Sequence, residues 1–141
     1  MNLCPCGGRG DPGAECSCSP QRLAAFRDKL SRALLDRFDL VVTVPRSRST
    51  DLAAGPGEAS ETVRARVTSA RERLARPLAR TAEADELLTR AVDRLPLSGR
   101  GRARVARVAR SIAALAGADK VLPEHVAEAL AYRHPRELSS A

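Results

Sequence analysis

The sequence predicts an α+β fold that is mostly helical, in which a cysteine-rich loop, short helices and one strand precede a bundle of helices. Three observations support this prediction. Apolar residues recur at helical spacing from Ser60 onward, one run of apolar, mostly β-branched residues lies at Leu40–Val44, and glycine and cysteine dominate the first 18 residues. A length of 141 residues suits one domain, or one domain with an appendage.

Residues 1–45 are expected to form the smaller part. Ser19 is a good N-cap and Pro20 suits the first helical position, so a helix should run from there to about Leu30. The stretch "SRALLDRF" predicts a second short helix that leads into a strand at Leu40–Val44. A lone buried strand leaves its backbone groups unpaired. This strand therefore either pairs within a fold that the sequence does not reveal or belongs to a larger α/β domain.

Residues 46–59 are rich in Gly, Pro and Ser and are predicted as a linker, whereas residues 60–135 are predicted as a bundle of four amphipathic helices. Ser98 should cap the third helix, Gly117 should end it as a C′ residue, and residues 136–141 should form a disordered tail. The apolar stripes consist of Val63, Val67, Ala70 and Leu74; of Leu87, Leu88, Ala91, Val92 and Leu95; of Val105, Val108, Ala109, Ile112 and Ala116; and of Val126 and Leu130.

The amino-acid composition favours some classes of binding partner over others. The net charge is +7 and almost all of the basic residues are arginine, which permits nucleic acid or a nucleotide as a partner. Two Phe, one Tyr and no Trp are too few for a base-stacking surface. No apolar run approaches the roughly 18 residues that span a bilayer. The start "MNLCPCGG" lacks the features of a secretion signal, so a cytoplasmic location is predicted.

Four cysteines lie close together in the sequence, as two pairs separated by nine residues. They are Cys4, Cys6, Cys16 and Cys18. Two short knuckles that each supply two thiolates are typical of a structural zinc site, and four cysteines would leave no open position for catalysis. The spacing C-x-C is less diagnostic than C-x-x-C. Four reduced cysteines in a surface loop, or two redox-labile pairs, remain as alternatives.

Two groups of arginines stand out. Arg37, at the corner between the second helix and the strand, can act as an arginine finger toward a neighbouring subunit, although spacing alone favours a local ion pair with Asp36 or Asp39. Arg100, Arg104 and Arg107 share one face of the third bundle helix. Arg100 lies in the first turn, where backbone amides and a guanidinium can bind one anion together. A solvated basic face is the alternative interpretation, and Arg104 and Arg107 are weaker candidates for contacts to nucleic acid.

Several motifs together resemble one family. They are "NLCPCG", "CSCSP", "LLDRFDL", "LSGRGRARVARVARSIAALAG" and "HVAEALAYR". In combination they are similar to the C-terminal half of magnesium-chelatase-like AAA+ ATPases, in particular the bacterial ComM/YifB competence-associated type. The resemblance covers nearly the whole chain and is weakest over residues 46–96. It implies that residues 1–45 are the end of an AAA+ core and that residues 60–135 are its helical lid.

The resemblance implies roles for individual residues. Asn2 matches the sensor-1 asparagine, which orients the attacking water near the γ-phosphate. Arg37 matches the arginine finger, and Arg100 matches the sensor-2 arginine of the lid. The four cysteines match the cysteine cluster of the family. ATP with Mg²⁺ is therefore implied as a cofactor alongside zinc, and the implied partners are like subunits, or the N-terminal half of the family fold, in a hexameric ring.

The departures from the family pattern limit what these residues can do alone. The 141 residues contain neither a G-x-x-x-x-G-K-[ST] loop nor an acidic Walker-B strand, so they lack the groups that grip the phosphates and Mg²⁺. We expect no ATPase activity from this chain alone. With the P-loop half, the expected function is a motor on DNA, in branch migration or natural transformation. Two other hypotheses stay open: a standalone, zinc-stabilised basic module that binds nucleic acid, and a non-functional remnant.

Overall fold

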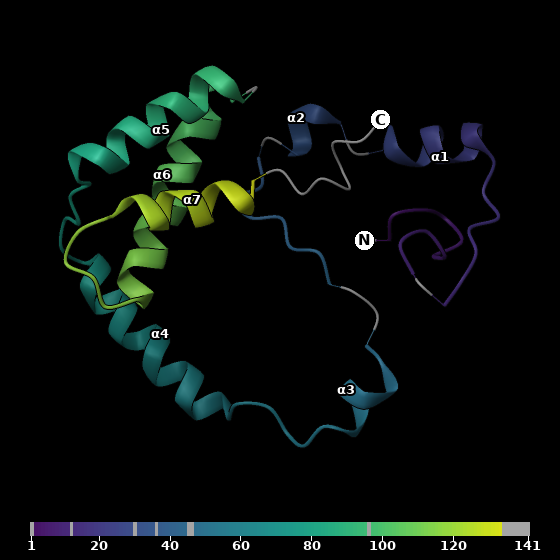
Figure 1. The fold of residues 1–141 in the computed structure, drawn as a ribbon, viewed down its shortest axis with the longest axis horizontal. Helices are drawn as coiled ribbons and strands as arrows, with labels where there is room; N and C mark the ends of the chain where they lie inside the picture. Colours follow the sequence, from purple (N-terminus) through teal and green to yellow (C-terminus); the bar gives the residue numbers. More distant parts are fainter. Residues whose placement is uncertain are drawn as a thin grey trace.

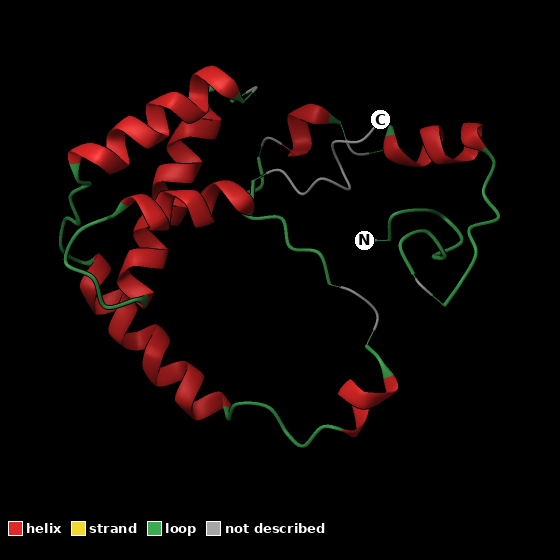
Figure 2. Ribbon diagram, in the orientation of Figure 1, coloured by secondary structure: helices red, strands yellow, loops and turns green. Residues whose placement is uncertain are grey.

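The computed structural model describes residues 2–11, 13–29, 31–35, 37–44, 47–95 and 97–133. Within these ranges it contains helices but no strand (Figures 1 and 2). The helices are α1 (Pro20–Arg27), α2 (Arg32–Leu35), α3 (Ser49–Ala53), α4 (Ser60–Leu74), α5 (Ala82–Arg94), α6 (Gly99–Leu115) and α7 (Pro123–Ala131). The coarse prediction of a mostly helical chain is therefore confirmed. The first helix ends at Arg27, earlier than predicted. The predicted tail at residues 136–141 lies outside the described residues.

Helices α4, α5, α6 and α7 form a bundle (Figure 1), and its buried core lies among α5, α6, α7 and the segment before α7. Helix α6 packs against α4, α5 and α7, and α5 also packs against α7. Most residues of the predicted apolar stripes are buried or half-buried, because that is how these helices remove apolar surface from water. Leu95 is an exception: it lies just after α5 and is 38% exposed. The buried core consists of Ala84, Leu88, Val105, Val108, Ala109, Ala113, Val121, Val126 and Ala129.

Local capping fixes where the bundle helices begin and end. The Ser98 hydroxyl accepts a hydrogen bond of 3.0 Å from the Gly101 amide at the start of α6. Gly117 follows α6 with a φ of 74°, the left-handed conformation that favours glycine. At the start of α7, the buried His125 accepts a hydrogen bond of 3.0 Å at Nδ1 from the Leu122 amide. The predicted N-cap and C′ residues of α6 are thus confirmed.

A short parallel bridge joins the segments that lead into α5 and α7. The Thr81 amide donates to the Val121 carbonyl at 3.0 Å, and the Val121 amide donates to the Ala79 carbonyl at 2.9 Å. Val121 is fully buried. The two hydrogen bonds therefore hold the starts of these two helices side by side.

The strand predicted at Leu40–Val44 is wrong for this structure: the residues are irregular, and the Val41 amide donates to the carbonyl of Tyr132, the residue after α7. A strand needs a neighbouring strand to satisfy its amides and carbonyls, and the described residues offer none. The apolar side chains of this segment consequently face solvent, with Val42 62% and Val44 84% exposed.

Two smaller expectations about helices also differ from the structure. The predicted linker contains the short, fully exposed helix α3. At the end of α6, Ala116 is exposed, whereas Ala113 and Ala114 are buried. Because α6 packs against three other helices, its buried face is wider than the single stripe read from the sequence.

Candidate functional site

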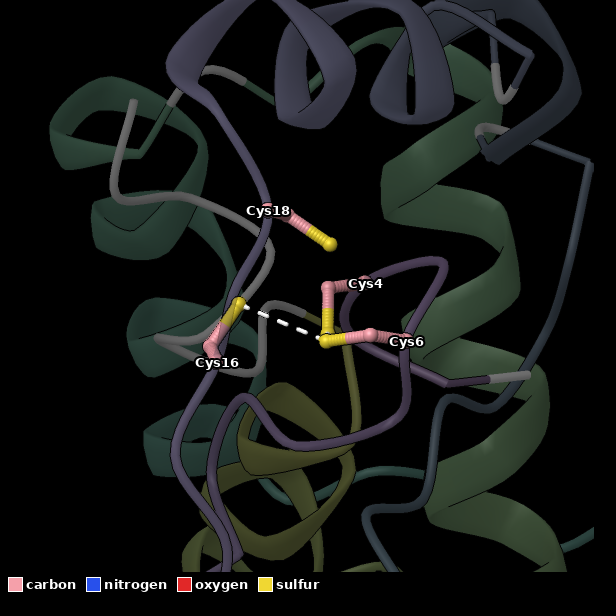
Figure 3. Close-up of side chains that lie close together, drawn as sticks. All are labelled: Cys4, Cys6, Cys16 and Cys18. Carbon is pink, nitrogen blue, oxygen red and sulfur yellow. Dashed lines mark hydrogen bonds between the residues drawn. The ribbon is translucent and has the colours of Figure 1, made fainter.

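The four cysteines converge on one point of the N-terminal loop. Their sulfur atoms all lie within 4.8 Å of one another, and the side chains point toward a common centre (Figure 3). The Sγ atoms of Cys4 and Cys6 are 3.4 Å apart, and those of Cys6 and Cys16 are 3.7 Å apart. Cys4 is fully buried, whereas Cys6 and Cys16 are exposed. The structure thus brings together the four residues that the sequence singled out.

Glycines and backbone amides shape the first knuckle. The Gly7 amide donates to the Cys4 carbonyl at 3.2 Å, in a turn where Gly7 has a φ of 82°. A Cβ on Gly8 would lie 2.7 Å from the Glu15 carbonyl oxygen, so only glycine lets the knuckle approach the segment of the second cysteine pair. The Arg9 amide donates to Cys4 Sγ at 3.2 Å, which stabilises negative charge on that sulfur.

The donor set fits a metal ion such as zinc. Tetrahedral zinc with four Zn–S bonds of about 2.3 Å holds its sulfurs about 3.8 Å apart. The two closest pairs, at 3.4 and 3.7 Å, are near that spacing. Four thiolates would complete the coordination sphere, so the arrangement suits a structural ion and leaves no position for a reacting water.

Two of the thiols have shifted pKa values. The Gly8 amide and the neighbouring thiols lower the pKa of Cys6 to about 6. The pKa of Cys16 is raised to about 11: the Cys18 amide lowers it, but desolvation and the three neighbouring thiols together outweigh that hydrogen bond. The cluster therefore contains one thiol that ionises readily and one that retains its proton at neutral pH.

The three residues matched to nucleotide chemistry lie on separate elements. Asn2 is exposed in the cysteine-rich loop, and Arg37 is exposed just after α2, where its amide donates to the Leu34 carbonyl at 2.9 Å. Arg100 is exposed in the first turn of α6, directly after the Ser98 cap. Arg37 and Arg100 are both exposed, so each can contact a ligand that is bound by another part of an assembly.

Arg104 and Arg107 make contacts that sequence reasoning missed. Arg104 Nη1 lies 2.7 Å from Oδ1 of Asp39, and Arg107 Nη1 lies 3.7 Å from the same oxygen. One residue earlier, the Phe38 carbonyl accepts a hydrogen bond from Nη1 of the buried Arg133. The spacing of Arg104 and Arg107 on one helix face was the available signal, but nothing in the sequence pointed to Asp39 as their partner.

No helix within the described ranges is long and apolar enough to cross a membrane.

Comparison with known proteins places both parts of the chain in one family. Residues 1–52 match the family model described as magnesium chelatase, subunit ChlI, and residues 57–133 match the model described as magnesium chelatase, subunit ChlI C-terminal. The second match alone covers more than half of the 141 residues.

Curated relatives agree with these matches. An uncharacterised protein of Mycobacterium tuberculosis is 38% identical over 152 residues, which cover 94% of this chain and 30% of the relative. The competence protein ComM of Haemophilus influenzae is 32% identical over 133 residues, covering 82% of this chain and 26% of the relative. The uncharacterised protein YifB of Escherichia coli is 32% identical over 134 residues, with the same coverage.

The chain thus spans less than a third of the length of the relatives it matches. The first matched range contains the cysteine-rich loop and Arg37, and the second contains α6. On these grounds the chain belongs to the magnesium chelatase ChlI family and is a magnesium-chelatase-like protein of the ComM and YifB type.

Proposed function

We propose that this chain forms the arginine-finger corner and the lid of an ATP-hydrolysing site in a ring of like subunits. The main support is that residues 1–52 and 57–133 match two models of one family. The motifs that contain Arg37 and Arg100 resemble the arginine-finger and sensor-2 motifs of that family. The P-loop and the acidic residue that hold the phosphates and Mg²⁺ would come from residues outside these 141, because no such motif occurs in them.

The positions of the arginines suit these roles. Arg37 is exposed at the corner after α2, so its guanidinium would stabilise the charge that develops on the transferred phosphoryl group in a neighbouring subunit. Arg100 is exposed in the first turn of α6, where the helix dipole also favours an anion. Asn2 would orient the attacking water, and a hexamer is the expected assembly.

DNA is the partner we propose for the assembled protein. The net charge of +7 favours binding to phosphates. The relative from Haemophilus influenzae is named a competence protein, which agrees with a role on DNA. Arg107, 67% exposed, is better placed for such contacts than Arg104, which is 22% exposed and paired with Asp39.

A phosphate-release assay tests the proposed function. The 141-residue chain alone should show no Mg²⁺-dependent turnover of ATP. A chimaera in which this chain replaces the aligned segment of the mycobacterial relative should hydrolyse ATP, and duplex DNA should stimulate it at low salt but not at high salt. Sustained turnover by the chain alone, or an inactive chimaera when the intact relative is active, would refute the proposal.

We also propose that the cysteine cluster binds one structural zinc ion per chain. This ion would stabilise the loop that carries Asn2. The cluster supports this with four thiols, one buried ligand and the amide of Arg9 directed at Cys4. Zinc here would have no part in hydrolysis, because four thiolates leave it no free position.

Zinc affinity should rise with pH across the neutral range and continue to rise above it. Zinc binds thiolates, so a bound proton competes with it. Cys6, with a pKa of about 6, is mostly ionised at pH 7, whereas Cys16, with a pKa of about 11, must lose its proton to the solvent on binding. Binding should thus weaken as the pH falls, because protons compete with zinc for this thiol. Chelator competition at several pH values measures the slope, and a flat profile would contradict the prediction.

A further inference from the structure

Residues 38–41 are tied to the bundle by Arg104 on α6 and by Tyr132 and Arg133, which directly follow α7. We call the latch the set formed by Asp39, Arg104 and Arg133 together with the backbone of Phe38 and Val41. Asp39 pairs with Arg104 at 2.7 Å, and Arg133 donates to the Phe38 carbonyl. The Val41 amide donates to the carbonyl of Tyr132 at 2.9 Å. Three successive contacts thus fix a segment that has no regular structure of its own.

The latch is partly removed from solvent, which separates it from an ordinary surface ion pair. The Arg104 side chain is 22% exposed, and its buried Nε has no hydrogen-bond partner among the described residues. Arg133 is 8% exposed, and its Nη2 lies 3.5 Å from the position of a Cβ on Gly101, so the guanidinium passes close over the first turn of α6. Ion pairs in such surroundings are less screened and hold their geometry better than exposed pairs.

The latch connects the segment of Arg37 to the first turns of α6, where Arg100 lies. Asp39 follows Arg37 by two residues, and Arg104 follows Arg100 by four residues, about one helical turn. The contact between Asp39 and Arg104 therefore connects the corner of Arg37 to the first turns of α6, across 65 residues of sequence.

We infer that Asp39, Arg104 and Arg133 are positioning residues. Their contacts would make the segment of Arg37 move together with the helical lid. This inference rests on the proposed roles of Arg37 and Arg100. A nucleotide that draws α6 toward itself through Arg100 would, through the latch, move Arg37 relative to the neighbouring subunit. Without the latch, Arg100 would still contact nucleotide, but the position of Arg37 would no longer follow the lid.

Hydrogen exchange in the 141-residue chain tests the latch itself. Asp39→Asn keeps the shape of the side chain but removes its charge, and it should speed exchange of the Val41 amide about fivefold or more. The Val121 amide, in the bridge of the bundle core, should be unaffected, which separates local release from unfolding. Asp39→Glu, which keeps the carboxylate, should restore most of the protection. Unchanged exchange at Val41 in Asp39→Asn would overturn the inference.

A double-mutant cycle assigns the effect to the pair. Arg104→Gln should speed exchange at Val41 as Asp39→Asn does, and the double variant should be no faster than either alone. The matched control is Asp119→Asn, because Asp119 also pairs with an arginine, Arg73, at 3.6 Å but is 99% exposed. Additive effects of the two latch substitutions, or an equal effect of the control, would show that the pair does not act as a unit.

Kinetics of the chimaera test the positioning role. Asp39→Asn should lower kcat about tenfold while changing KM for ATP less than about twofold, because Arg100 still contacts the nucleotide. In an Arg37→Ala background, Asp39→Asn should lower kcat no further. A normal kcat, or a loss confined to KM, would refute the positioning role. If the unmutated chimaera is inactive, the proposed function fails, and the exchange results alone decide whether the latch exists.

Discussion

Replacing Cys4 with serine should abolish binding of one zinc ion per chain and release the loop at residues 2–18. Cys4 is the one fully buried sulfur of the cluster, and it accepts a hydrogen bond from the Arg9 amide. A serine hydroxyl is a poor zinc ligand, and three remaining thiolates would bind zinc at least about 100-fold more weakly. Elemental analysis gives the zinc content, and tryptic cleavage after the exposed Arg9 should become faster as the loop opens.

The matched control for Cys4→Ser is Ser17→Ala, an exposed position between two of the cysteines. It changes the same loop by one oxygen and should leave zinc content and cleavage as they are. Chelator should speed cleavage after Arg9 in the unmutated chain and in Ser17→Ala, but not further in Cys4→Ser. A wild-type chain purified at neutral pH with far less than one zinc per chain would refute the zinc proposal.

Arg37→Ala should lower kcat of the ATP-hydrolysing chimaera by about 10³-fold or more while leaving nucleotide affinity within about threefold. An arginine finger acts mainly on the charge of the transition state, so its loss affects turnover far more than binding of the ground state. Phosphate release measures kcat, and equilibrium titration with a fluorescent ATP analogue measures binding. Arg64→Ala, which removes an exposed arginine of α4, is the matched control and should be nearly silent.

Mixing experiments can show that Arg37 acts on a neighbouring subunit. An Arg37→Ala subunit lacks the finger but has an intact lid, and an Arg100→Ala subunit has the opposite defect. If each residue serves a different nucleotide, mixed rings contain some interfaces with both groups intact, and activity should partly return. Recovery that never exceeds the sum of the two separate variants, or an equal loss of ATP binding in Arg37→Ala, would argue against the finger.

The helices of the bundle could be predicted from the sequence because their signals are local. Ser98 and Gly117 mark the limits of α6 through a side-chain cap and a positive φ, and both depend only on near neighbours. The stripe of Val105, Val108 and Ala109 faces inward for the same reason, since helical periodicity alone places these residues on one face. The convergence of the four cysteines also followed from spacing and from the flexibility of the glycines between them.

The remaining features depend on contacts that no local pattern contains. The run at Leu40–Val44 has strand composition, yet it forms no strand where the described residues offer no neighbouring strand. The sequence offers Asp39 only as a partner for Arg37, two residues before it, because sequence patterns relate residues a few positions apart. Its contact with Arg104 bridges 65 positions, and that of Arg133 with Phe38 bridges 95. The fold alone determines such pairs.

The tie between Val41 and Tyr132 has a consequence for how length can vary within the family. Between Val41 and the start of α4 at Ser60, the described residues, α3 included, are all exposed. Since closing a longer loop costs only about 0.6 kcal/mol per doubling of its length, insertions or deletions here would barely disturb the packed helices. We therefore expect homologues to differ most in length in this segment, and a foreign peptide could be inserted there.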